Sequence, residues 1–175
     1  MKQILLMIGM VALVGCGEKP AEESVFDQGR PDVTKPSKPP AKTEAQIEPE
    51  AKAFAETKGK AEAGDAIAQF NLGWMYDEGK GVEQDFKEAV KWYQKAADQG
   101  VADAQYKLGS RYYNGEGVPQ DYVTAYAWYN IAAANGDTDA ATWKDNTAKR
   151  LTPAQIAEAE ELVKEMVKKN PKLLQ

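Results

Sequence analysis

DAIAQFNLGWMYDEGKGVEQDFKEAVKWYQKAADQG (residues 65–100) is followed without a gap by VADAQYKLGSRYYNGEGVPQDYVTAYAWYNIAAANG (residues 101–136). Aligned end to end, the two segments are identical at seventeen of thirty-six positions, where chance would give about two. An internal repeat of this length is typical of helical arrays in which each unit packs on its neighbours. The sequence therefore predicts an all-α fold, an α/α solenoid of helix hairpins.

The first half of each repeat has the spacing of a helix. Ala68, Leu72 and Tyr76 follow one another at four-residue steps, which places them on one helix face. Gly73 and Gly109 fall in the middle of these helices, where glycine costs about 1 kcal/mol relative to alanine. Because this cost recurs at the same place, we expect a neighbouring helix to pack directly against the backbone there.

Two glycines separated by one residue follow each first helix, in 79–82 and 115–118. Glycine-rich turns can bind phosphate through backbone N–H groups, but no strand precedes these turns, and glycine commonly ends a helix in the left-handed conformation. We interpret them as helix caps.

The second half of each repeat predicts a helix that begins after Asp85 or Asp121, both good N-cap residues. Trp92 and Tyr93 alternate with alanines at steps of three and four residues, and the same arrangement recurs 36 residues later. An aromatic cage for a ligand is one interpretation of this pair. Recurrence at the same helical phase favours core packing of large residues over small ones.

The shared pattern, A-x-A-Q-x-x-L-G-x-x-Y-x-x-G-x-G-V-x-Q-D-x-x-x-A-x-x-W-Y-x-x-A-A-x-x-G, resembles the Sel1-like repeat (SLR), a relative of the tetratricopeptide repeat. The resemblance implies a right-handed superhelix with a concave face lined mainly by first helices. It also implies peptide or protein binding on that face by an adaptor. Counting a leading half, two full hairpins and a degenerate terminal pair gives about seven helices.

The repeats define the expected domain, residues 50–175. Full repeats occupy 65–100 and 101–136, and degenerate repeats flank them at 50–64 and 137–170. Thr152-Pro153-Ala154-Gln155 is a capping box with proline at the first helical position, and it predicts a helix to about Lys169. We expect this helix to cover the end of a monomeric array; dimerisation through it is the alternative.

The N-terminal region indicates a lipoprotein. Residues 1–15 form a short apolar segment after Lys2, as in a secretory signal peptide. Leu13-Val14-Gly15-Cys16 resembles the lipobox of bacterial lipoproteins, which implies cleavage before Cys16 and lipidation of its thiol. Gly17 in place of aspartate then implies the outer membrane, facing the periplasm. Residues 16–49 are rich in proline and charge and predict a disordered tether.

Composition excludes several classes of function. The chain has no histidine and one cysteine, which excludes His-dependent nucleophilic catalysis, imidazole-bound zinc and an intramolecular disulfide. The net charge of −5, without a basic segment, argues against nucleic-acid binding. We therefore expect no catalytic, cofactor or metal site, and a membrane association that depends on the lipid anchor.

Recognition is expected at positions that differ between the two copies, because the shared residues are needed for packing. Aromatic residues and arginine are common interface anchors. Replacing Trp74 and Arg111 together is expected to abolish binding without changing the melting temperature. A cell-wall hydrolase that uses Asp77 and Glu78, or an inhibitor of such an enzyme, is the alternative function. The candidate groove residues are Asn71, Trp74, Met75, Lys107, Arg111 and Tyr113.

Overall fold

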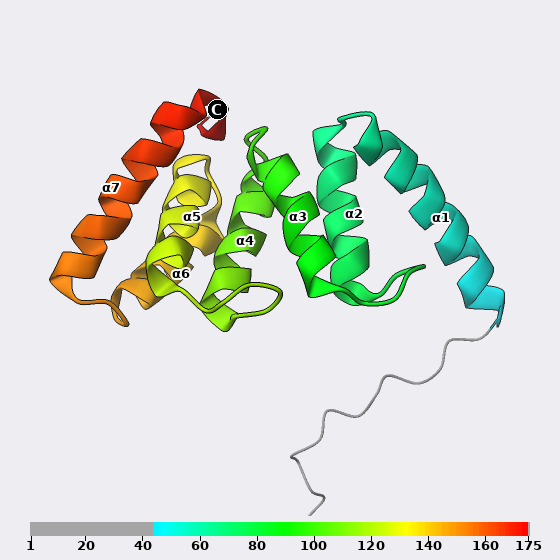
Figure 1. Cartoon of the computed structure of the whole chain (residues 1–175), viewed down its shortest axis with the longest axis horizontal. Coiled ribbons are helices and arrows are strands. Elements are labelled where there is room, and N and C mark those ends of the chain that lie inside the picture. Colours follow the sequence, from blue (N-terminus) through cyan, green and yellow to red (C-terminus); the bar gives the residue numbers. More distant parts are fainter. Residues whose placement is uncertain (1–43, 175) are drawn as a thin grey trace, which may run out of the picture. The chain divides into compact units, whose positions relative to one another are not determined.

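The computed structural model describes residues 44–174, and no strand occurs in this part of the chain (Figure 1). Its elements are α1 (Glu44–Glu62), α2 (Ala66–Glu78), α3 (Phe86–Ala97), α4 (Ala102–Asn114), α5 (Tyr122–Ala134), α6 (Thr138–Ala148), α7 (Pro153–Lys169) and the 3₁₀ helix η1 (Pro171–Leu173). The predicted all-α repeat fold with seven helices is confirmed. The predicted signal peptide, Cys16 and residues 17–43 lie outside the described residues.

The two full repeats form two helix hairpins, α2 with α3 and α4 with α5. Three of these helices begin at an aspartate whose carboxylate accepts backbone N–H groups of the first turn, as expected of N-caps. The Asp65 carboxylate accepts from the Ala68 N–H at 2.7 Å, and Asp85 and Asp121 each accept two such bonds. An aspartate directly before each of these helices thus fixes where the helix starts.

The glycines in the middle of α2 and α4 allow the second helix of each hairpin to approach closely. A Cβ atom on Gly73 would lie 2.7 Å from Cδ1 of Tyr93, and one on Gly109 would lie 2.6 Å from Cδ1 of Tyr129. Both tyrosines are fully buried. The expected packing of a neighbouring helix against the backbone is confirmed, and in each hairpin the neighbour is the tyrosine ring of the second helix.

The two glycines of each pair after α2 and α4 have different structural roles. Gly79 and Gly115 end their helices in the left-handed conformation, which confirms the expected caps. A Cβ atom on Gly81 would overlap the carbonyl oxygen of Glu50 in α1, and one on Gly117 would overlap that of Phe86 in α3. Because these two carbonyls are 36 residues apart, α1 has the same relation to α2 that α3 has to α4.

The helix α1 begins at Glu44, six residues before the expected boundary at 50, and contains Pro49. A proline near the start of a helix removes one backbone hydrogen bond and already has a helical φ, so the turns that follow can still form.

A ladder of side-chain amides joins successive repeats. Gln69 donates to the Ala61 carbonyl at 3.1 Å, and Gln105, 36 residues later, donates to the Ala97 carbonyl at 3.3 Å. The amide oxygens of Gln69 and Gln105 accept in turn from the residues that follow α3 and α5, Gln99 and Asn135, each at 2.8 Å. These bonds explain why a buried glutamine is kept in both copies.

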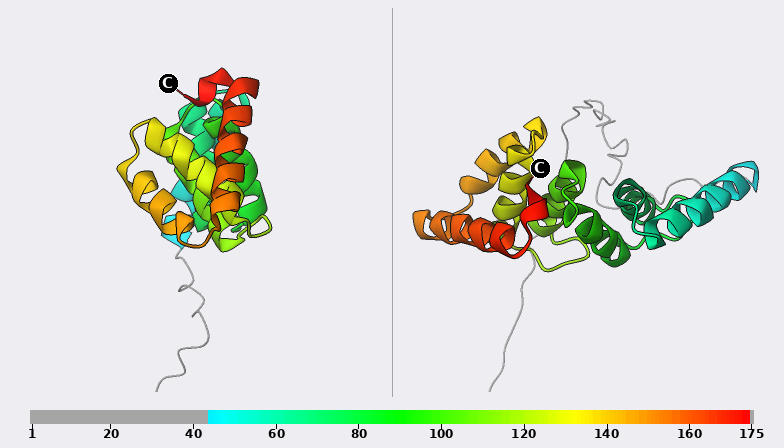
Figure 2. Two further views of the ribbon diagram at one scale, coloured as in Figure 1. Left: turned by 90° about the vertical axis from the view of Figure 1, so that its left-hand side faces the viewer. Right: turned by 90° about the horizontal axis from the view of Figure 1, so that it is seen from above.

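The C-terminal helix begins at the predicted capping box, which is complete, and ends at Lys169 as expected. It does not form a hairpin with α6. Instead α7 packs against α5, beside which it runs in Figure 2. The chain then returns through η1, where the Leu173 carbonyl accepts bonds from Gln105 at 2.9 Å and Asn135 at 2.6 Å.

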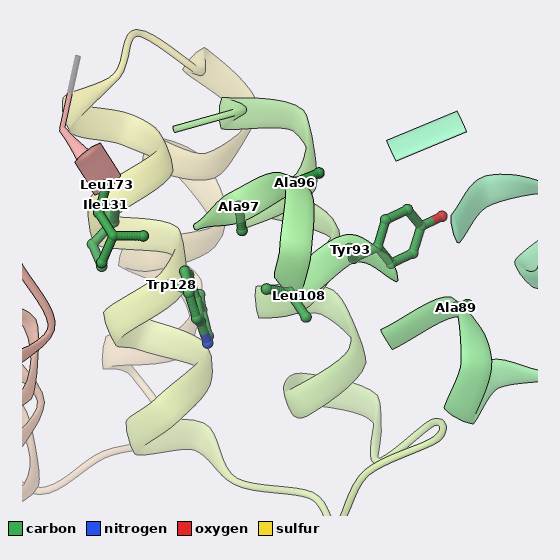
Figure 3. Packing of buried hydrophobic residues seen from close by; sticks show 9 residues of the cluster. Ala89, Tyr93, Ala96, Ala97, Leu108, Trp128, Ile131 and Leu173 are labelled. Carbon is green, nitrogen blue, oxygen red and sulfur yellow. The ribbon is translucent and has the colours of Figure 1, made fainter. Parts of the chain in front are cut away.

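The position of α7 explains why α5 is apolar on nearly all sides. Figure 3 shows Trp128 and Ile131 of α5 together with Leu173 of η1 in one buried cluster, against which Val163 and Met166 of α7 pack. The helix α3 has no such cover among the described elements, and its outer face keeps charged residues.

Candidate functional site

The exposed face of the first helices repeats at the same spacing as the core. Residues three and four apart lie on one side of a helix, and equivalent positions in α2, α4 and α6 are 36 residues apart. We define the first-helix face as the nine residues of this stripe, all of them exposed or half-buried: Ile67, Asn71, Trp74, Asp103, Lys107, Ser110, Asp139, Trp143 and Asn146.

Large apolar side chains are exposed on this face. Ile67 and Trp74 on α2 are 60% and 40% exposed, and Trp143 on α6 is 38% exposed. Among residues 48–174 the only other exposed large apolar side chain is Leu174, next to the C-terminus. Large apolar side chains exposed on one face of a folded protein indicate a binding face.

Three of the six predicted groove residues lie on the first-helix face. Asn71 and Trp74 are exposed on α2, and Lys107 is half-buried on α4. Met75 and Arg111 are equivalent to each other in α2 and α4, and each lies next in sequence to a residue of the stripe but closer to the interior. Met75 is buried. The structure thus brings Asn71, Trp74 and Lys107 onto one stripe, and their role in binding stays a prediction.

Arg111 is part of a buried ionic cluster. Its side chain is 12% exposed, and Nη2 lies 3.0 Å from Oδ2 of the buried Asp77. The Tyr93 hydroxyl donates to the same oxygen at 3.2 Å, and the guanidinium also pairs with Glu116 and lies over the Phe86 ring. The cluster joins α2, α3 and α4, so Arg111 contributes to the junction between the two repeats.

Burial controls the electrostatics of this cluster. Desolvation raises the pKa of Asp77 above its ordinary value of 3.8, although the Arg111 charge opposes the shift. Burial likewise raises the pKa of the Tyr93 hydroxyl, and the nearby Asp77 charge adds to the effect. Within residues 48–174, Oδ1 of Asp77 and Nε of Arg111 are the buried side-chain atoms without a hydrogen-bond partner. Removing Arg111 would leave the buried Asp77 without its counter-charge, so we expect replacement of Arg111 to lower the melting temperature, in contrast to the expectation from the sequence.

The next junction is aromatic. Tyr113, the sixth predicted groove residue, replaces Asp77 in the second copy, and its ring centroid lies 5.1 Å from that of Tyr122 and 5.5 Å from that of Trp143. Trp143 also stacks on the buried Tyr129 at 6.3 Å. Sequence reasoning did not select Trp143, although counting 36 residues from Lys107 leads to it.

Within residues 48–174 no three His, Cys, Asp or Glu side chains are placed to hold a metal ion together. In the same part of the chain, no helix is both long enough and apolar enough to span a bilayer.

Hairpins of constant period, linked by the amide ladder and carrying their variable residues on one face, define a helical-repeat protein. Residues 66–101 and 102–137 match the family model described as Sel1 repeat, so the chain contains two Sel1 repeats. Sel1 repeats generally mediate protein–protein interaction, and their fold is typically a non-enzymatic scaffold.

Solved structures show the same fold. The protective antigen c5321 of uropathogenic Escherichia coli, which displays an SLR fold, is 40% identical with a TM-score of 0.66, over 70% of this chain and 27% of that chain. A Sel1 repeat protein from Oxalobacter formigenes is 43% identical with a TM-score of 0.50, over 51% of this chain and 37% of that one.

Sequence relatives are matched over short stretches. The putative sel1-like repeat-containing protein L18 of Acanthamoeba polyphaga mimivirus is 46% identical over 39 residues, which are 22% of this chain and 7% of that protein. The chitin synthase regulator SKT5 of Saccharomyces cerevisiae is 51% identical over 37 residues, which are 21% and 5%. This chain therefore spans a small part of these relatives.

We predict that Arg111→Met lowers the free energy of unfolding by about 3 kcal/mol, because it leaves Asp77 buried without its counter-charge. The additional change Asp77→Asn should recover most of this loss. Denaturant unfolding of the two single variants and the double variant measures the coupling. Equal stability of Arg111→Met and the natural protein would contradict this account of the cluster.

The same variant should show a characteristic pH dependence. Without Arg111, the pKa of Asp77 rises further, so the folded state binds the carboxyl proton more tightly than the unfolded chain does. The stability deficit of Arg111→Met should therefore be greatest above the folded pKa and shrink as the pH falls toward 3.8, the ordinary value. A deficit that grows on acidification would have the wrong sign.

Proposed function

We propose that this protein is a lipid-anchored adaptor of the bacterial cell envelope that binds a peptide or protein partner on the first-helix face. The observation that carries this proposal is the exposure of Ile67 and Trp74 on α2 and of Trp143 on α6, all three on that face. The residues shared between the copies cannot supply recognition in the same way, because they are buried in the repeat core or cap its helices.

The chemistry of the face suits an apolar segment of a partner that is flanked by polar groups. Trp74 offers a large surface at low conformational cost, and such residues dominate binding energies at interfaces. Asn71 and Lys107 supply hydrogen-bond donors beside it. Asp77 and Glu78 are the carboxylates suggested for catalysis. Asp77 is buried and already paired with Arg111 and Tyr93, so we propose no hydrolytic role for Asp77 and Glu78.

The anchor is proposed from the sequence around Cys16. Leu13-Val14-Gly15-Cys16 follows an apolar segment in the manner of a lipobox, and several acyl chains would hold the protein on a membrane firmly. We propose the periplasmic side of the outer membrane as its location, because Gly17 follows the cysteine. Residues 17–43 would then separate the monomeric solenoid from the bilayer, and the partner would be another envelope component.

We predict that Trp74→Ala combined with Lys107→Ala weakens capture of the native partner by at least about tenfold, because Trp74 is an exposed anchor. The test is chemical crosslinking in intact cells followed by affinity purification and quantitative mass spectrometry of the partners. Lys52→Ala, at an exposed position on α1, is the matched control. Circular dichroism should show unchanged helicity. The same partners recovered in the same amounts from the double variant would count directly against this face.

We predict that Cys16→Ser abolishes incorporation of an alkyne-labelled fatty acid and releases the protein from the membrane fraction, because the thiol is the acyl acceptor. Fractionation of cells that express the full chain, with an immunoblot to separate processed from unprocessed protein, gives the readout. Processed Cys16→Ser protein that stays in the membrane fraction would contradict the proposed anchor.

A further inference from the structure

We propose that the outer face of α3 is a second docking site, which takes an amphipathic helix of a partner protein with carboxylates beside its apolar stripe. This α3 face forms a groove of about 420 Å³ lined by Glu88, Val90, Lys91, Trp92, Gln94 and Lys95. It belongs to a second helix, and none of its residues is on the first-helix face.

The chain itself supplies the template for this docking. The equivalent face of α5, 36 residues later, is covered by α7, a helix that is apolar on one side and charged on the other. There the ring of Trp128 and the side chain of Ile131 belong to a buried cluster against which Val163 and Met166 of α7 pack. Trp92 of α3 is the counterpart of Trp128, but it is already buried to 9% exposure against Ala61 and Leu72, so only the edge of its ring lines the groove.

The amide ladder offers a second point of contact for a helix docked on α3. Gln105 uses its side-chain NH₂ group twice, once for the Ala97 carbonyl and once for the Leu173 carbonyl in the segment that follows α7. Gln69, its counterpart beside α3, donates to the Ala61 carbonyl, and no second acceptor occurs among residues 48–174. A helix docked on α3 and followed by a turn could present a backbone carbonyl to Gln69, as η1 does to Gln105.

The charges on α3 decide what kind of helix fits. Lys91 and Lys95 stand where α5 has Ala127 and Ile131, both fully buried under α7. The Lys95 ammonium lies 3.6 Å from the centre of the Trp92 ring, so a partner would meet a positive charge where the edge of this ring reaches the groove. Lys91 already pairs with Glu88, so the Lys95 ammonium is the charge that a uniformly apolar stripe would have to desolvate without a carboxylate partner. A carboxylate beside the stripe would pair with Lys95.

A helix of a different protein is favoured over α7 of a second copy of this chain, because α7 is already packed on α5. Its apolar side is buried on α5, and the turn that follows it is bound to Gln105 and Asn135. Freeing α7 to dock on α3 of another copy would expose Trp128 and Ile131. The helix that docks on α3 therefore belongs to a different protein, whereas α7 remains a convenient source of a probe sequence.

The test uses a fluorescein-labelled peptide with the sequence of residues 152–174, which has an apolar stripe flanked by Glu158, Glu161 and Glu165. Fluorescence anisotropy measures its binding to the full-length protein in detergent. We expect saturable binding that K91E/K95E weakens at least about tenfold. A peptide in which Glu158, Glu161 and Glu165 are replaced by lysine should show the opposite preference. K52E/K58E on α1 is the matched control, and thermal melting verifies that each variant is folded.

The outcomes separate the possible occupants. Equal binding of the peptide to the natural protein and to K91E/K95E, or no saturable binding up to about 1 mM, a limit that corresponds to about −4 kcal/mol, would overturn the proposal. Light scattering that shows a dimer of the natural protein, lost in K91E/K95E, would overturn it in favour of a second copy of this chain. Because Trp74→Ala lies on another face, it should leave peptide binding unchanged.

Discussion

The fold depends on a tyrosine ring packed against the backbone of a glycine. In each hairpin the second helix approaches the first so closely that a Cβ atom on Gly73 or Gly109 would lie within 2.7 Å of the tyrosine ring. The distance between the helices is therefore set by the absence of a side chain. The energetic disadvantage of a mid-helix glycine is offset by burial of a whole aromatic residue.

Once this distance is fixed, the other shared residues can repeat their contacts. Gln69 and Gln105 reach the carbonyl of the preceding second helix, and Gly81 and Gly117 let the loop lie against its start. The junctions differ in what fills the space that remains. An ion pair between Asp77 and Arg111 joins the first repeat to the second, whereas aromatic rings around Tyr113 and Trp143 join the second to α6. Different chemistry at successive junctions opposes pairing of the wrong units.

The sequence predicts much of this because it repeats. Helix phase, the left-handed caps and the tight packing at Gly109 all follow from residues shared at 36-residue spacing. The capping box likewise predicts α7. Single-copy features are harder to predict. Packing of α7 on α5 has one signal in the sequence: α5 has Tyr126, Ala127 and Ile131 where α3 has Val90 and two lysines. This difference could be interpreted only once the structure placed α7 on that face of α5.

The candidate site could likewise be predicted only in part from the sequence. Sequence comparison of the copies correctly separates variable from shared positions, and it places Trp74 on an exposed helix face. It does not reveal that the Arg111 side chain is only 12% exposed and ion-paired, because its partner Asp77 lies 34 residues away and on another helix. A charged residue at a variable position can complete a junction as readily as it can meet a partner, and burial distinguishes the two.

The central claim is tested most directly by the stability of Gly109→Ala. The new Cβ atom would meet the Tyr129 ring at 2.6 Å, so we expect a loss of about 1–3 kcal/mol in the free energy of unfolding, measured with urea. Gly59→Ala is the matched control, because no atom lies within 4 Å of its Cβ position, and helix propensity should make it more stable by up to about 1 kcal/mol. A Gly109→Ala protein at least as stable as the natural one would contradict the account.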